Sequence, residues 1–241
     1  MANRRVLVTG ASGFVGRALC AELTAAGDEV RAAVRTAQPG AGSTCRVIAV
    51  GDIDAGTDWS RALEGMDAVV HLAARTHVTN DRTRGVLGEF RRINVQGSVR
   101  LAQQALASGV RRFVFLSSVK VNGELTRESP FRETDLPQPG DAYGISKWEA
   151  ELGITSTCAQ SSMQLTILRA PLLYGAGAKG NLFALMRAIE RGWPLPIGAA
   201  RNRRTLLNVR NLSGAIRLCL DHPAAAGATF LVADEPLISS W

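Results

Sequence analysis

The chain is poor in the residues that mark specialised architectures. Its 241 residues include four cysteines, three histidines and two tyrosines, and only three of its 28 basic residues are lysines. The cysteines show no paired spacing and have no histidine cluster nearby, so we expect free, buried thiols in a reducing compartment and no metal site. These cysteines are Cys20, Cys45, Cys158 and Cys219.

Long apolar runs are also absent, which excludes a membrane-spanning helix. The first apolar run is short and stops at a glycine turn, unlike the apolar region of a secretory signal. With 46% hydrophobic and 20% charged residues, the composition is that of a globular protein. We therefore predict a cytoplasmic protein.

The net charge is +7 and the pI is about 9.9. The basic residues are scattered along the chain as pairs, such as Arg4-Arg5 and Arg111-Arg112, and form no long stripe. This pattern does not favour nucleic acid as a partner. We expect a polyanionic small molecule instead.

Glycine is concentrated in a motif near the N-terminus, where a short apolar strand runs into a helix. Gly10, Gly13 and Gly16 stand three residues apart. The first suits the positive φ of a tight turn, the second the approach of a phosphate, and the third close helix–strand packing. The turn, which also contains Ser12, Phe14 and Val15, is therefore predicted to bind a dinucleotide pyrophosphate at a helix N-terminus.

Strands alternate with helices through residue 170, which predicts an α/β fold, a Rossmann-type doubly wound parallel sheet. Residues 86–108 are expected to form one long helix, stopped by Gly109, and this helix and the next are candidates for a homodimer seam. The regular alternation of strands and helices ends after residue 170. We therefore predict two parts, a dinucleotide-binding domain, 1–170, and a smaller substrate lobe, 171–241. That lobe should contain strands at 204–209 and 229–232 with a helix at 211–220 between them, and the chain looks cut short.

The second strand, residues 29–35, ends where such folds read the adenosine ribose. Arg35 stands there without a carboxylate close by in the sequence, which favours NADP, with NAD as the alternative. Asp52 and Ile53 follow the third strand and are placed to meet the adenine. The small-residue turn after the fourth strand adds Leu72, Ala73 and Ala74 to the expected cofactor site.

Tyr143 and Lys147 are four residues apart on a predicted helix and so project from one face. A neighbouring ammonium, plus the positive charge of an oxidised nicotinamide, stabilises phenolate and should lower the pKa of the tyrosine. The tyrosine could then exchange a proton with a substrate hydroxyl while hydride moves to or from a nicotinamide. Ser118, at the end of the adjacent strand, can hydrogen-bond the same oxygen.

The chain resembles the extended short-chain dehydrogenase/reductases that modify nucleotide sugars, often called NAD-dependent epimerases/dehydratases. The resemblance covers nearly the whole chain. Beyond the glycine turn it rests, in order, on Gly51-Asp52, His71-Leu72-Ala73-Ala74, Asn94-Val95-Gln96-Gly97, Ser117-Ser118, Tyr143-Gly144-Ile145-Ser146-Lys147, Arg169-Ala170-Pro171, Tyr174-Gly175 and Arg204-Thr205-Leu206-Leu207-Asn208-Val209.

The resemblance implies roles for single residues. Tyr143 would be the acid/base, Lys147 would orient the nicotinamide ribose, and Ser118 would hold the reacting oxygen. His71 would be a packing residue at a strand end. The cofactor site would gain Asn94 and Pro171, and a UDP-linked sugar would be held by Ser118, Val119, Lys120, Asn181 and Arg204.

Three functions stay open at this stage. The stretch from Ser117 to Glu124 resembles reductases of UDP-4-keto-6-deoxy-amino sugars in surface-polysaccharide synthesis, and with Arg35 it favours NADPH-dependent reduction of a 4-keto sugar. The second is a UDP-glucose-type 4-epimerase with bound NAD, although this chain has Asn122 where many such enzymes have an aromatic residue. The third is a non-catalytic dinucleotide-binding regulator.

Overall fold

The computed structural model describes residues 3–36, 45–76, 85–126, 129–178, 181–193, 203–235 and 238–239. Its main body is a seven-stranded sheet in the order β10-β6-β5-β4-β1-β2-β3, and every pairing in it is parallel. The strand order reverses between β1 and β4, as in dinucleotide-binding sheets. The strands are β1 (Arg5–Thr9), β2 (Glu29–Val34), β3 (Arg46–Ala49), β4 (Ala68–His71), β5 (Arg112–Ser118), β6 (Gln164–Ala170) and β10 (Thr229–Leu231).

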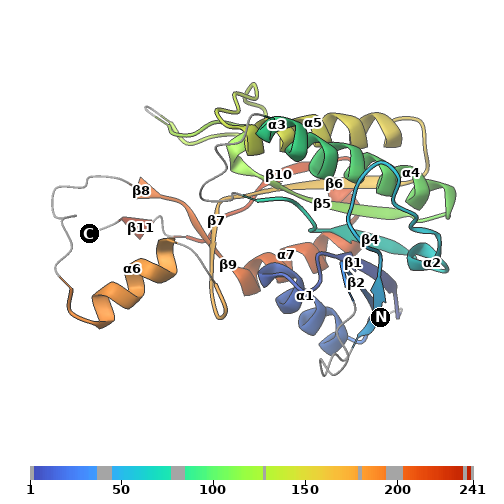
Figure 1. Ribbon diagram of the computed structural model, residues 1–241, viewed down its shortest axis with the longest axis horizontal. Helices are drawn as coiled ribbons and strands as arrows, with labels where there is room; N and C mark the ends of the chain where they lie inside the picture. Colours follow the sequence, from blue (N-terminus) through green and yellow to red (C-terminus); the bar gives the residue numbers. More distant parts are fainter. Residues whose placement is uncertain are drawn as a thin grey trace.

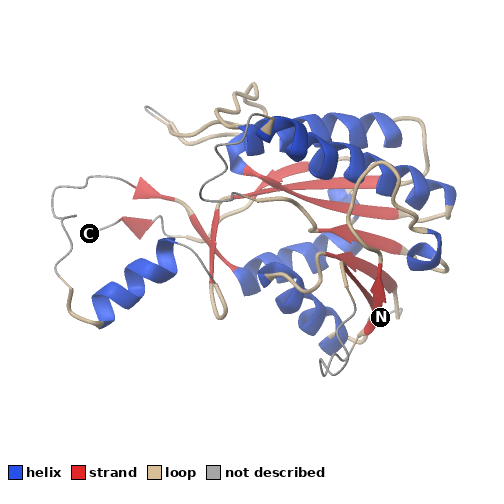
Figure 2. Cartoon of the chain, viewed as in Figure 1, coloured by secondary structure: helices blue, strands red, loops and turns tan. Residues whose placement is uncertain are grey.

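Helices cover both faces of this sheet, which confirms the predicted doubly wound fold (Figures 1 and 2). One face packs against α1 (Phe14–Ala25) and α7 (Val209–Asp221), with Leu19 and Ile216 in the same apolar cluster. The other carries α2 (Ser60–Leu63), α4 (Ser98–Ala107) and α5 (Ala142–Cys158), whose apolar residues form a second cluster. Central strands such as β4 are buried along their whole length, as expected for a parallel sheet covered twice.

The single long helix expected at residues 86–108 is interrupted. It consists of α3 (Val86–Phe90), a π-helical segment η1 (Arg91–Gly97) and α4. The π segment contains Asn94, whose amide nitrogen donates to the Arg75 carbonyl at 3.0 Å and to Ser146 Oγ at 2.9 Å. A π turn carries an extra residue, and such turns occur often at functional sites.

The smaller lobe lies beside the main body (Figure 1). It holds β7 (Leu172–Tyr174) paired with β9 (Leu206–Asn208), β8 (Arg203–Arg204) paired with β11 (Ile238–Ser239), and α6 (Asn181–Glu190). The strand expected at 204–209 is therefore split into β8 and β9, and Val209 already begins α7. Short 3₁₀ turns complete the elements, η2 (Val119–Val121) and η3 (Pro223–Ala225).

The strand expected in the smaller lobe at 229–232 lies elsewhere. It is β10, which pairs with β6 at the edge of the main sheet. Leu212 and Ile216 of the preceding helix α7 are buried in the same apolar cluster as Val6 and Val8 of β1. The chain thus leaves the main body after β6 and returns to it, and the division at residue 170 stays a prediction.

Three of the four free cysteines are buried and Cys158 is half-buried. Across the described ranges, no helix combines the length and apolar character needed to span a bilayer.

Candidate active site

A cleft of about 2490 Å³ opens at the carboxyl ends of the main strands and extends to the smaller lobe. This is the edge where parallel sheets bind ligands. Of the predicted site residues whose side chains the structure describes, all except Asn94 line the cleft. Asn181 begins α6, and its side chain lies outside the described part of the molecule.

The glycine turn has the backbone geometry predicted for it. Gly10 has φ +66°, and a Cβ there would lie 2.8 Å from the Ala73 nitrogen. A Cβ on Gly16 would overlap the Gly10 carbonyl oxygen and lie 2.6 Å from the Ala11 Cα. Since α1 begins directly afterwards at Phe14, the turn presents free N–H groups and the positive helix end to the cleft.

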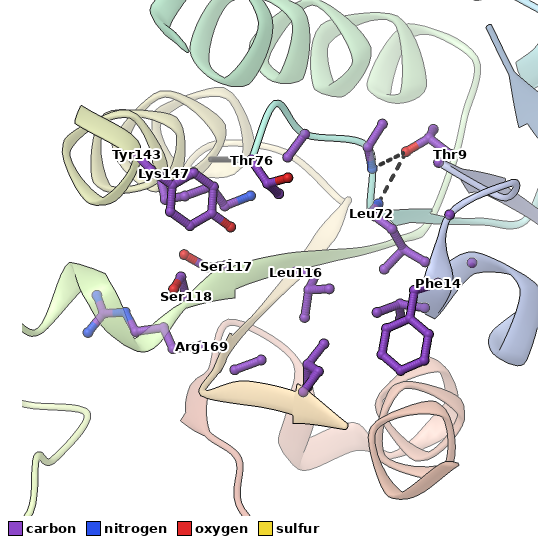
Figure 3. A pocket seen from close by; sticks show the side chains of 18 of the residues that line it. Thr9, Phe14, Leu72, Thr76, Leu116, Ser117, Ser118, Tyr143, Lys147 and Arg169 are labelled. Atoms are coloured by element: carbon purple, nitrogen blue, oxygen red, sulfur yellow. Dashed lines mark hydrogen bonds between the residues drawn. The ribbon is translucent and has the colours of Figure 1, made fainter. Parts of the chain in front are cut away.

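The turn at Leu72 and Ala73 is held by a hydroxyl on the neighbouring strand (Figure 3). Thr9 Oγ1 accepts from the nitrogens of both residues at 3.2 Å. With both lone pairs used, its proton points to His71 Nδ1 at 2.6 Å, and His71 Nε2–H then donates to Ser98 Oγ at 2.8 Å. Burial, with a smaller effect of the Lys147 charge, lowers the pKa of His71 to about 3, so the ring is neutral. His71 is indeed a buried strand-end residue.

The structure corrects the expectation that Arg35, at the predicted adenosine end of the cleft, has no carboxylate near it. Arg35 has a carboxylate close by: its Nε lies 3.1 Å from Asp52 Oδ1, and both side chains are exposed. The parallel pairing of β2 and β3 continues beyond the strands, because the Gly51 nitrogen donates to the Arg35 carbonyl at 3.2 Å. Residues 17 apart in sequence are thereby brought side by side.

Ser118, Tyr143 and Lys147 lie together at the other end of the cleft (Figure 3). Ser118 ends β5, Tyr143 lies in the first turn of α5, and Lys147 follows one turn later. Lys147 is buried, with its Nζ 3.9 Å from the centre of the Phe115 ring. Burial lowers the pKa of Lys147 to about 7, against the opposing charge of Glu151.

The pKa of Tyr143 departs from the sequence expectation. We expected a lowered pKa with both an ammonium and an oxidised nicotinamide nearby, whereas in the protein alone burial raises it to about 12, and the Asp141 carboxylate acts in the same direction. The phenol ring also packs against Phe90, with ring centroids 6.2 Å apart. In the protein alone, desolvation of phenolate outweighs the neighbouring ammonium.

Sequence reasoning missed a buried charged network beneath these residues. Arg169 Nη2 lies 2.7 Å from Glu151 Oε2, and both side chains are at least 95% buried. Ser117 Oγ donates to Glu151, and Arg169 Nη1 donates to Asn122 Oδ1 at 3.1 Å. The network joins β5, β6 and α5 directly below Ser118. One signal could have revealed it, because Glu151 stands four residues after Lys147 on the same helix face.

The residues predicted to hold the sugar nucleotide differ in their surroundings. Arg204 is exposed and lines the cleft from the smaller lobe. Lys120, by contrast, is paired with Asp141 at 2.5 Å and with Glu124 at 3.3 Å. Val119 begins the 3₁₀ turn η2, whose first turn is capped by Ser118 Oγ accepting from the Lys120 nitrogen at 3.2 Å.

The strand order, the glycine turn and the serine–tyrosine–lysine group define a dinucleotide-binding protein of the extended short-chain dehydrogenase/reductase class. The model of the NAD dependent epimerase/dehydratase family matches residues 6–233. The chain belongs to the NAD-dependent epimerase/dehydratase family.

Known relatives agree with this assignment. The chain is 44% identical over 240 residues to a protein of Vibrio cholerae named UDP-glucose 4-epimerase, covering 98% of this chain and 73% of that relative. It is similar to the solved structure of MoeE5 in complex with UDP-glucose and NAD, with TM-score 0.83, 30% identity, and 98% and 78% of the two chains covered. A short-chain dehydrogenase/reductase superfamily protein from Agrobacterium tumefaciens with bound NAD gives TM-score 0.80 and 28% identity, covering 98% and 79%.

Proposed function

We propose that this protein is a 4-epimerase of a UDP-linked hexose that works with a bound NAD. The observation that carries the proposal is that Ser118, Tyr143 and Lys147 line the same cleft as the glycine turn. The 44% identity to the UDP-glucose 4-epimerase of Vibrio cholerae supports this over the 4-keto-sugar reductase favoured by the sequence motifs. UDP-glucose is accordingly the first substrate to test.

The residues of the cleft fit a dinucleotide. Gly10 and Gly16 let the backbone of the turn pack against itself and against Ala73 more closely than any side chain would allow. The resulting cradle, the glycine turn at the positive end of α1, suits a pyrophosphate. Asp52 lies at the adenosine end, and Lys147 lies at the other end, where the nicotinamide ribose would be held. A nicotinamide dinucleotide bound there supplies the acceptor, and later the donor, of a hydride.

The side chains around the reacting carbon handle the proton. Tyr143 is a neutral phenol in the protein alone, and the positive charge of an oxidised nicotinamide together with Lys147 would favour its phenolate. As phenolate it would accept the proton of the C4 hydroxyl while the C4–H bond breaks with loss of hydride, which leaves a 4-ketone. Ser118 Oγ–H donates a hydrogen bond to the same oxygen, and Lys147 stabilises the phenolate. Return of a hydride to the opposite face of C4, with return of the proton from Tyr143 to the C4 oxygen, would invert the centre, so the overall reaction neither oxidises nor reduces the sugar.

NAD is the proposed cofactor, in place of the NADP favoured by the sequence. Two similar solved structures hold NAD. The Asp52 carboxylate beside Arg35 also supports NAD, because it occupies a donor that a 2′-phosphate would need and adds a negative charge. Arg35 alone is therefore a weak basis for choosing NADP.

The test is to denature the purified protein and to identify any released nucleotide by mass spectrometry, alongside an assay of UDP-glucose conversion to its C4 epimer. We expect close to one NAD per chain and conversion without added cofactor. Release of no nucleotide, with reduction of a UDP-4-keto sugar that depends on added NADPH, would replace the epimerase by the reductase. Binding of a dinucleotide without conversion of UDP-glucose or reduction of a UDP-4-keto sugar would instead favour the regulator.

A further inference from the structure

Lys120 and Asp141 flank the two residues that must face each other across the sugar. Lys120 follows Ser118 by two residues, and Asp141 precedes Tyr143 by two. Lys120 Nζ lies 2.5 Å from Asp141 Oδ2, and both side chains are more than two-thirds buried. The other oxygen, Asp141 Oδ1, accepts from the Gly144 nitrogen at 2.7 Å and so caps the N-terminus of α5.

Two further contacts join the same segments. The backbone nitrogen of Lys120 donates to Ser118 Oγ at 3.2 Å. The residue whose side chain pairs with Asp141 therefore also orients the serine, through its backbone. Gly144 lies so close to η2 that a Cβ on it would be 2.8 Å from the Lys120 carbonyl oxygen. The 3₁₀ turn after β5 and the first turn of α5 are thus locked together by one ion pair, one cap and one close backbone contact.

We propose that the Lys120–Asp141 pair is a positioning device that fixes Tyr143 relative to Ser118, so that Lys120 acts through α5 and not by binding the sugar nucleotide. This inference rests on the proposed function for its catalytic consequence. Its structural part, the fastening of the first turn of α5, does not depend on that function. Figure 3 shows the outcome, with Tyr143 on α5 and Ser118 on β5 facing the same space.

The members of the pair carry opposite charges beside Tyr143. The charged groups around this tyrosine are Asp141 at the N-cap of α5, Lys147 on α5, Lys120 on η2 paired with Glu124, and Arg75 over the Phe90 ring. The Asp141 charge raises the pKa of Tyr143. Loss of that charge should lower the pKa, whereas loss of the Lys120 charge should raise it further.

Matched variants separate positioning from substrate binding. Lys120→Met keeps the apolar stem, and Asp141→Asn keeps the capping oxygen, so both should fold. We expect each to lower kcat by at least roughly tenfold with little change in the KM for the UDP-sugar or in NAD affinity, and Lys120→Arg to recover most of the loss. The limb of the pH–kcat profile that reports phenolate should move to higher pH in Lys120→Met and to lower pH in Asp141→Asn.

A second readout needs neither cofactor nor turnover. Hydrogen exchange of the amides at 144–145, measured in the protein without ligand, should be faster in both variants and normal in Lys120→Arg. If the wild type proves to be no epimerase, the proposed function fails, and the exchange rates still decide whether the pair fastens α5. Unchanged exchange, pH limbs that move in the same direction, or a Lys120→Met that raises only KM would overturn the inference.

Discussion

At the α1 end of the cleft the binding surface is backbone, whereas at the α5 end it is side chains. The cradle depends on Gly10 and Gly16 because neither residue has a side chain that would prevent the close backbone packing. The polar groups behind it, Thr9 and His71, are neutral. The α5 end buries charges, with Lys147 beside Phe115 and Glu151 paired with Arg169. A preformed backbone cradle suits the part of a ligand that stays unchanged, and buried charges suit the part where a proton must move.

The largest expected effect is at the α5 end. Tyr143→Phe removes the only group proposed to exchange the C4 proton, so turnover of UDP-glucose should fall by about 10²–10⁴-fold. NAD affinity should change by no more than a few-fold, since the ring remains. Tyr174→Phe is the matched control, because the chain has only two tyrosines and Tyr174 OH donates to Asp234 away from the reacting group. Turnover near the wild-type rate in Tyr143→Phe would remove this residue from the mechanism.

The buried pair should dominate stability at this end. Glu151→Gln leaves Arg169 buried without a counter-charge, and we expect the free energy of unfolding to drop by about 3–5 kcal/mol. Urea unfolding measures this directly. Glu89→Gln breaks the exposed pair with Arg92 and should change stability little. Equal losses in the two variants would contradict the claim that burial makes the loss of the Glu151 charge costly.

The cradle should fail for a steric reason. Gly16→Ala places a Cβ onto the Gly10 carbonyl oxygen and against Ala11, although alanine is the better helix former. We expect at least about a tenfold loss of NAD affinity by titration and a lower Tm. Gly214→Ala in α7 meets nothing within 4 Å and should raise Tm by a few degrees. A Gly16→Ala protein that binds NAD as tightly as the wild type would show that the turn is not the pyrophosphate site.

The same contrast explains what could be read from the sequence. The glycine turn, α5 and the alternation of strands with helices up to residue 170 follow from spacing along the chain, and the structure has them as expected. The pairs Arg35–Asp52, Lys120–Asp141 and Glu151–Arg169 join segments 17 to 21 residues apart. Local periodicity does not encode such pairs, because they depend on strand register and helix placement. The raised pKa of Tyr143 could not be predicted from the sequence for the same reason, since burial is a property of the whole fold.

The smallest effect is expected behind the cradle, and it depends on pH. The unfolded chain takes up a proton on His71 near its ordinary pKa of 6.5, whereas the folded protein takes it up only near about 3. Between these values the unfolded state binds more protons, so the free energy of unfolding falls as the pH falls, by up to about 1.4 kcal/mol per pH unit.

His71→Asn keeps an acceptor for the Thr9 hydroxyl and cannot be protonated. It should be somewhat less stable at neutral pH, because the ring no longer fills its site, yet lose less stability on acidification. Urea unfolding at several pH values below 6.5 gives the slope for the wild type and for His71→Asn, and the slope should be steeper in the wild type. If His71→Asn has the same slope as the wild type, protonation of His71 does not cause the loss of stability in acid. The assignment of His71 as a neutral ring in the hydrogen-bond chain from Thr9 to Ser98 would then be wrong.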